Sequence, residues 1–350
     1  MRTFKKALLC MQRSFTYLTL ILLFSFTLNG KAQEYKVYTR IDRHVKSVPD
    51  SLDDNLLSLH SYLIQKAKTP REELRAFYIW IINNIRYYQR EELMYDPNFL
   101  FYMGSRNCST PNCVLEQKYA VCEGYTNLLQ AFCQLSGIES YVISGYVRQK
   151  GIKYDRATHA WNAVKVDGKW LFIDATWGSA NRGTKTYNAQ DYFLVSADKF
   201  VMYHLPLSKQ WQFLETPVSF SVFVQGETAV ANYLKQQSSF YHYDDSIASL
   251  HRLSKLERLK KTAEDIAEAN PSNRFNQAWE YYRYARISFN YQNSQKTKNI
   301  DKLNESYKLM QKSKFLFSQC DGVPAGIMVR KLDYSLLTIG KAIDELEASD

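Results

Sequence analysis

The sequence predicts an α+β fold in which a mixed core of helices and strands precedes an all-helical region. Three observations lead to this prediction. An apolar pattern of helical period begins at Cys122, two β-type runs flank the Asp167-Gly168 pair, and long helical patterns with few Gly or Pro follow residue 246. The 350 residues are 45% hydrophobic and 23% charged, which is the composition of a folded protein of about two or three domains.

Residues 1–32 are predicted to be a signal peptide. Basic residues in the first 13 positions precede a 12-residue uncharged apolar run at 17–28, and small residues follow at 30 and 32. The run is shorter than the roughly 20 residues that a membrane-spanning helix needs. We therefore expect an exported protein, periplasmic or extracellular, with no integral membrane segment after cleavage. An uncleaved N-terminal anchor is the alternative.

The net charge does not indicate a nucleic-acid partner. The chain carries a formal charge of +10, but five of its basic residues and none of its acids fall within residues 1–32, which leaves +5 on the remainder. No concentrated basic stripe remains there, so we expect no binding to nucleic acid.

The chain after the signal peptide divides into four predicted segments. Residues 33–69 form a lead-in with one helix, and residues 70–220 form the core, which opens with a helix at Thr69-Pro70. Residues 221–245 are expected to be a linker. Residues 246–350 are expected to form about four or five helices, which offer a surface for a protein partner.

Five cysteines follow the signal peptide, so at least one thiol stays unpaired in an oxidising compartment. Cys108 and Cys113 lie in the polar stretch NCSTPNC and are candidates for a local disulfide. A zinc pair is the alternative, but no second His or Cys pair follows at metal-ligand spacing. We expect no metal and no cofactor.

Cys122 is predicted to begin an amphipathic helix. Tyr125, Leu128 and Phe132 share one face of that helix, and Gly137 stands where the helix should end. At the start of a helix, unpaired backbone N–H groups and the helix dipole favour a thiolate over a thiol. Cys122 is therefore a candidate nucleophile. The alternative is a small buried apolar residue.

His159 and Asp174 are predicted to share one face of a β-hairpin. With Asp167 and Gly168 as the two loop residues, Val166 pairs with Lys169, and Asp174 becomes the diagonal neighbour of His159. A carboxylate beside an imidazole selects its tautomer and stabilises the imidazolium form. The alternative for His159 is a surface or structural histidine.

Three segments carry a resemblance to a known family: 119–125 (YAVCEGY), 159–164 (HAWNAV) and 170–178 (WLFIDATWG). They resemble, in the same order, the motifs of the transglutaminase-like superfamily, and more narrowly its branch of kyphoscoliosis-peptidase and cytokinesis-associated proteins. Segments 77–87 and 192–214 are similar to the helix before that core and the tail after it. One departure is Ala120, where the family often has Gly.

The resemblance implies a papain-like core, with the nucleophile helix packed on an antiparallel sheet. It implies that Cys122 is the nucleophile, His159 the general base and acid, and Asp174 the orienting carboxylate. The backbone N–H of Cys122 and the side chain of Gln117 are candidate oxyanion donors. Trp161 and Trp177 are candidates for walls of the site.

The implied chemistry is acyl transfer through a thioester on a protein or peptide substrate. Water as acceptor gives a peptidase or amidase, whereas a lysine amine gives a cross-linking transglutaminase. We favour hydrolysis because it needs no second, amine-binding site. The alternative from another class is a catalytically silent scaffold or binding module of the same fold.

Overall fold

The computed structural model describes residues 38–87, 108–149, 151, 153–179, 189–236 and 240–348. These residues belong to two compact units. The first comprises the chain up to residue 139 together with residues 175–193, and the second comprises residues 140–174 and the chain from 194 onward. The predicted signal peptide lies outside the described residues. Within the described ranges, no helix has both the length and the apolarity to cross a membrane.

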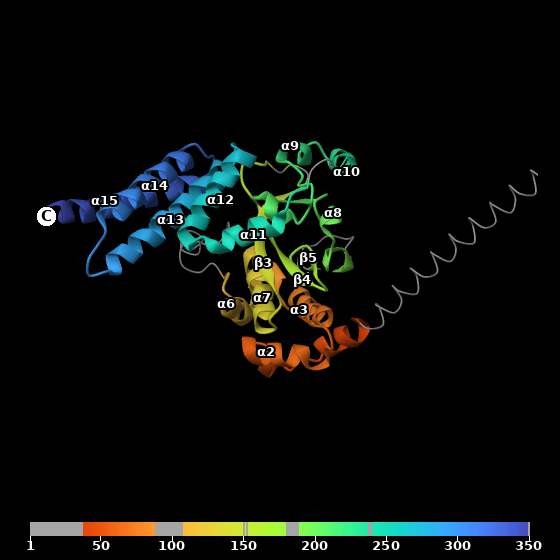
Figure 1. The fold of residues 1–350 in the computed structure, drawn as a ribbon. Coiled ribbons are helices and arrows are strands. Elements are labelled where there is room, and N and C mark those ends of the chain that lie inside the picture. The colour runs from red at the N-terminus through yellow and green to blue at the C-terminus, as the bar shows by residue number, and fades with distance from the viewer. Residues whose placement is uncertain are drawn as a thin grey trace, which may run out of the picture. The chain divides into compact units, whose positions relative to one another are not determined.

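The first unit is mostly helical (Figure 1). Residues 38–45 are helical, and short 3₁₀ turns lie at Asp50–Leu52, Ile64–Lys66 and Ala189–Tyr192. The longer elements are α2 (Leu56–Leu63), α3 (Pro70–Asn84), α6 (Pro111–Gln117) and α7 (Cys122–Leu135), with the short parallel pair β1 (Arg86–Tyr87) and β2 (Tyr119–Ala120).

Helix α3 begins at Pro70, as the sequence predicts. The side chain of Thr69 caps it by accepting a hydrogen bond from the backbone N–H of Glu72. Its fully buried Phe77 stacks on Phe132 of α7, with ring centroids 5.0 Å apart. This apolar contact joins the two longest helices of the first unit.

The second unit contains an antiparallel four-stranded sheet. Its strands are β3 (Ser140–Val147), β4 (His159–Val166), β5 (Lys169–Ile173) and β6 (His204–Pro206), in the order β5-β4-β3-β6. The predicted hairpin is confirmed, since Val166 pairs with Lys169 and the register continues to Asn162 opposite Ile173. Asp167 and Gly168 both have positive φ, at 53° and 72°, as a two-residue type I′ turn requires.

Gly145 allows the strands of this sheet to come close together. It pairs with His159 on β4 and with Pro206 on β6. A Cβ atom there would lie 2.2 Å from the carbonyl oxygen of Leu205 and 2.6 Å from the ring of Trp161. Glycine is therefore required for β6 to pack at this distance.

The C-terminal part of the second unit is a stack of helices (Figure 1). They are α11 (Tyr243–Arg252), α12 (Lys255–Ala269), α13 (Arg274–Ser294), α14 (Ile300–Ser318) and α15 (Val323–Glu347). Fully buried apolar side chains hold the last three together, among them Ala285, Leu303, Phe317 and Leu332. The predicted C-terminal helical region is confirmed.

Residues 221–245 are more ordered than the predicted linker. They carry the end of α9 (Phe220–Phe223), all of α10 (Glu227–Lys235) and the start of α11. Phe223 and Val230 are fully buried, and the guanidinium of Arg148 lies 4.4 Å from the centroid of the Phe223 ring. Phe223 and Val230 belong to an apolar cluster with Tyr146 of β3 and Leu205 of β6. The segment therefore contains packed helices, and its role as a linker between domains stays a prediction. Two shorter elements, α8 (Ala197–Phe200) and the 3₁₀ turn Lys209–Gln212, flank β6.

Candidate active site

Cys122 is the first residue of α7, where the sequence predicts it. Val121 caps the helix in an extended conformation, and its carbonyl accepts hydrogen bonds from the N–H groups of Gly124 and Tyr125. The thiol is half-buried. Cys122 therefore lies at the positive end of the α7 helix dipole.

The backbone around Cys122 is tightly packed, and Gly124 makes this packing possible. A Cβ atom at Gly124 would lie 2.5 Å from the Cβ of Ala120 and 2.7 Å from the carbonyl oxygen of Cys108. Ala120, the departure from the family pattern, is buried and fits because residue 124 has no side chain. Cys108 and Cys113 are joined by a disulfide, the pairing that the sequence analysis favours. Among the described cysteines, Cys122, Cys133 and Cys320 are outside disulfides.

His159 and Asp174 lie side by side in the second unit. The Nε2 atom of His159 lies 2.7 Å from Oδ2 of Asp174, and the two residues are 7% and 0% exposed. His159 begins β4, while Asp174 follows the last residue of β5 directly. The hydrogen bond thus follows from the hairpin register that the Asp-Gly turn predicts.

A second histidine, His204, also bonds to Asp174. Its Nε2 atom lies 3.0 Å from the same oxygen, Oδ2, and the residue is 2% exposed. Its ring stacks on Phe200 at a centroid distance of 4.0 Å and meets Trp161 edge-on at 5.0 Å. The sequence analysis missed this role. His204 is 30 residues from Asp174 and reaches it through a three-residue edge strand, which leaves no periodic pattern in the sequence.

The two histidines keep the buried carboxylate charged. Burial alone would raise the pKa of Asp174, but the charge of His159 and the hydrogen bonds from both histidines outweigh it and hold that pKa well below its usual range. Burial lowers the pKa of His204 below its ordinary value, although the hydrogen bond and charge of Asp174 oppose this. At neutral pH the group is therefore an Asp174 carboxylate that accepts a hydrogen bond from a neutral His204.

Within the described ranges, these three side chains lie close enough together to be considered as ligands of a metal ion. One ligand atom from each of His159, Asp174 and His204 lies within 4.8 Å of the others. Ligands about 2.1 Å from a tetrahedral zinc would lie about 3.4 Å apart. The Nε2 to Oδ2 distances of 2.7 and 3.0 Å are shorter and match hydrogen bonds. The arrangement therefore fits a carboxylate shared by two imidazoles better than a metal centre.

The other candidate residues lie at separate places. Trp161 is fully buried behind His204 in the second unit, so it is an interior residue of that unit. Gln117 is the exposed last residue of α6. Trp177 is half-buried and meets Tyr192 edge-on at 5.8 Å. Gln117 and Trp177 belong to the first unit with Cys122, and their roles as oxyanion donor and site wall stay predictions, as does the approach of Cys122 to His159.

Comparisons with known proteins agree with the resemblance in the motifs. Residues 58–175 match the family model described as the transglutaminase-like superfamily. Kyphoscoliosis peptidase from Mus musculus and from Homo sapiens is 29% identical over 229 residues, which are 62% of this chain and 32% of each relative. Hillarin from Drosophila melanogaster is 26% identical over 219 residues, which are 54% of this chain and 25% of that protein.

The chain thus spans about a third or less of the length of these curated relatives. A solved structure described as a TGase is 22% identical, with coverage of 46% of this chain and 41% of its own and a TM-score of 0.29. The family match begins at residue 58, within α2 and ahead of the core boundary predicted at residue 70, and it includes Cys122, His159 and Asp174. Residues 58–175 of this chain are a domain of the transglutaminase-like superfamily.

Proposed function

We propose that the chain is an exported cysteine-dependent enzyme that transfers acyl groups from protein or peptide amides through a thioester. Cys122 is the nucleophile, His159 the general base and acid, and Asp174 the carboxylate that orients His159. The observation that carries the proposal is the buried 2.7 Å hydrogen bond between His159 and Asp174 in a transglutaminase-like domain whose Cys122 begins a helix.

In the proposed reaction, the Cys122 thiolate attacks the carbonyl carbon of the amide, and the C–N bond breaks. The departing amine takes its proton from the imidazolium of His159. Water then attacks the thioester carbonyl and gives a proton to His159. The C–S bond breaks, and the carboxylic acid product leaves the Cys122 thiolate. Because Asp174 accepts the hydrogen bond from Nε2, these proton transfers would use Nδ1 of His159.

His204 has a supporting part in this scheme. It donates a second hydrogen bond to Oδ2 of Asp174, and this bond keeps the carboxylate ionised and oriented when His159 becomes charged. In the proposed enzyme, His204 is a positioning residue.

We propose hydrolysis as the overall reaction, with transamidation as the second possibility. Hydrolysis needs only water as acceptor, and the relatives at 29% identity include proteins named as a peptidase. One purified sample tests both reactions, by release of peptide fragments and by incorporation of a fluorescent primary amine into a glutamine-containing protein. Amine incorporation without peptide release would decide for transamidation.

A silent binding module is the competing function, and one observation favours it. Tyr334 and Leu337, three residues apart on one face of α15, are 76% and 74% exposed, and neighbouring exposed apolar side chains can serve as part of a partner surface. Such a module would not need a reactive thiol at Cys122.

Selective alkylation separates the two functions. Sub-stoichiometric iodoacetamide near neutral pH should label Cys122 before Cys133 and Cys320, which serve as internal controls. Replacement of His159 by Ala should slow labelling of Cys122, and Cys122→Ala should abolish activity while the fold persists. Equal labelling of Cys122 and Cys320 in the wild-type protein would contradict the enzyme.

Export of the protein is a proposal that rests on residues 1–32. Expression of the full-length chain followed by N-terminal sequencing should give a mature protein that begins near residue 33. Retention of Met1 in a membrane fraction would indicate an uncleaved anchor instead.

A further inference from the structure

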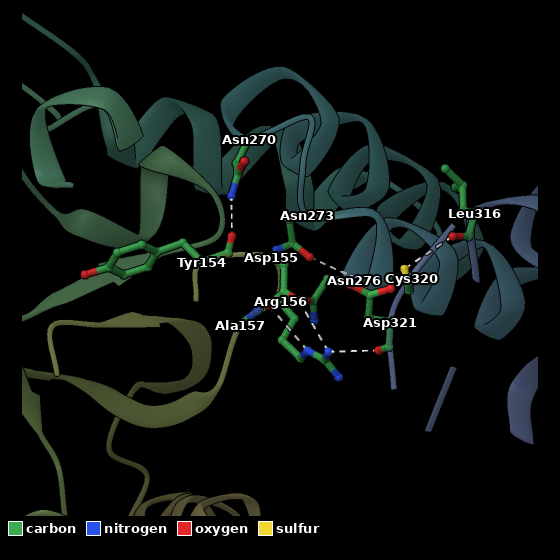
Figure 2. A network of polar contacts seen from close by, with 10 residues as sticks. All are labelled: Tyr154, Asp155, Arg156, Ala157, Asn270, Asn273, Asn276, Leu316, Cys320 and Asp321. Carbon is green, nitrogen blue, oxygen red and sulfur yellow. Dashed lines mark hydrogen bonds and ion pairs between the residues drawn. The ribbon is translucent and has the colours of Figure 1, made fainter. Parts of the chain in front are cut away.

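The segment just before His159 is held by the C-terminal helices. Thr158 still donates its N–H to the carbonyl of Gly145 on β3, at 3.2 Å. Residues 154–157, which precede it, lie beyond the paired part of β4. Backbone groups of Tyr154 and Ala157 instead bond to Asn270, between α12 and α13, and to Asn276 on α13, as Figure 2 shows.

Two asparagines hold the backbone of this segment at both ends. The side-chain amide of Asn270 donates to the carbonyl of Tyr154 at 2.9 Å, and the N–H of Ala157 donates to Oδ1 of Asn276 at 2.7 Å (Figure 2). Ala157 lies two residues before His159. A restraint on its N–H therefore limits where the backbone of His159 can move.

The turn between α12 and α13, residues 270–273, also holds the neighbouring strand β3. The hydroxyl of Tyr146 on β3 accepts hydrogen bonds from the side-chain amides of Asn270 at 3.0 Å and Asn273 at 2.6 Å. Tyr146 follows Gly145, the residue that pairs with His159. The two asparagines are 2% and 0% exposed, so these bonds are shielded from water.

The asparagine side chains are oriented within their own turn. Oδ1 of Asn270 accepts from the N–H and the hydroxyl of Ser272, at 3.2 and 2.6 Å. Oδ1 of Asn273 caps α13 by accepting from the N–H of Asn276 at 3.1 Å. The turn thus presents its donors and acceptors in fixed directions, a requirement for positioning another segment.

Arg156 adds a second, more exposed contact to the same region. Its guanidinium donates to the carbonyl of Asp321 at 3.3 Å and lies 5.0 Å from the centroid of the Phe275 ring. It also bonds to the carboxylate of Asp155 at 3.4 Å. Because these groups are partly solvated, we assign the main restraint to the asparagines.

We propose that the turn between α12 and α13, together with the first turn of α13, positions the general base, with Asn276 on α13 as the positioning residue that acts on His159 through Ala157. The C-terminal helices are then a working part of the catalytic unit. The catalytic consequence rests on the function proposed above, whereas the restraint on the backbone does not. The two therefore need separate readouts.

Three variants of the full chain test the proposal. Asn276→Ala removes the acceptor for the N–H of Ala157, and Asn276→Asp keeps an oxygen there at the third position of α13, where an acid suits the helix dipole. Ser313→Ala is the matched control, since it removes a buried 2.7 Å hydrogen bond to the carbonyl of Ala278 within the same helices and touches no loop residue.

Two measurements read the restraint without reference to activity. Hydrogen exchange of the amides of residues 154–160 should speed up about tenfold or more in Asn276→Ala, and the NMR signals of the His159 ring should shift or broaden. Both should return to the wild-type pattern in Asn276→Asp and stay unchanged in Ser313→Ala. Wild-type exchange and ring signals in Asn276→Ala would overturn the proposal.

Alkylation of Cys122 reads the catalytic consequence. Its rate near neutral pH should fall about 10- to 100-fold in Asn276→Ala, recover in Asn276→Asp and stay at the wild-type value in Ser313→Ala. An equal fall in Ser313→Ala would mean general destabilisation and would overturn the positioning role. If wild-type Cys122 reacts no faster than Cys320, the proposed enzyme fails, and the exchange and ring signals still decide whether the turn restrains His159.

Discussion

Replacement of His204 tests the physical basis of the site, because this residue supplies a hydrogen bond to a fully buried carboxylate. His204→Phe keeps an aromatic ring to stack on Phe200, where the centroids are 4.0 Å apart, but removes the donor. His204→Gln is the matched variant, since its side-chain amide can donate from nearly the position of Nε2.

The size of the effect follows from the charge on Asp174. A hydrogen bond to a charged group contributes about 1.5–3 kcal/mol. Asp174 is 0% exposed, so water cannot replace the lost donor. We therefore expect His204→Phe to lower the free energy of unfolding by about 2 kcal/mol at pH 8, and His204→Gln to lower it by less than about 1 kcal/mol.

The pH dependence of this loss has a defined sign. The pKa of Asp174 is depressed in the folded state, so its stabilisation is present above the unfolded pKa and is lost only as pH falls through the folded pKa. The pKa of His204 is also lowered in the folded state, below its ordinary value of 6.5. As pH falls below 6.5, His204 therefore takes up a proton in the unfolded state before it does so in the folded state, and the wild-type protein loses stability. His204→Phe has no imidazole at this position and therefore lacks the loss of stability that comes from protonation of His204. Its deficit relative to wild type should therefore shrink from pH 8 to pH 5.

Urea unfolding followed by circular dichroism at pH 8, 7, 6 and 5 measures these differences. The expected pattern is a large deficit for His204→Phe at pH 8, a smaller one at pH 5, and a small deficit for His204→Gln throughout. Equal stability of wild type and His204→Phe at pH 8 would refute the shared-carboxylate argument. A deficit that grows toward pH 5 would refute the assignment of His204 as neutral.

Three further tests, with four variants, address other contacts. Gly145→Ala should lower the free energy of unfolding by about 1–3 kcal/mol, since a methyl group would lie 2.2 Å from the carbonyl oxygen of Leu205. Gly326→Ala is the control: it has open space around it and should leave stability unchanged or raise it. Thermal melts compare the two variants. In the proposed enzyme, Asp174→Asn should slow amide hydrolysis by about 10⁴-fold with little change in KM, and an unchanged kcat would contradict its orienting role. Phe223→Ala should lower the free energy of unfolding by about 3–5 kcal/mol in urea; a loss below about 1 kcal/mol would contradict its place in the apolar core.

Features that depend on neighbouring residues were predictable from the sequence. The Asp167-Gly168 turn determines the register of β4 and β5, and the register brings His159 beside Asp174. The position of α7 follows from its apolar period, and its end follows from the glycine at 137, which has a φ of 67°. The disulfide between Cys108 and Cys113 spans only five residues.

Features that depend on packing between distant segments required the tertiary structure. His204 reaches Asp174 because β6 pairs with β3, a contact that the missing side chain of Gly145 permits. Asn276 reaches Ala157 across 119 residues of chain. Periodicity reports which face of one element is apolar, but it does not report which other element covers that face.

The sequence by itself therefore determined the pair of His159 and Asp174 and the helix that begins with Cys122, because turn chemistry and helical periodicity act over a few residues. Only the tertiary structure decided that a second histidine shares the carboxylate and that the C-terminal helices hold the segment before His159. The physical reason is that a buried polar group must find a partner wherever the packed chain brings one, and the sequence distance to that partner is not constrained.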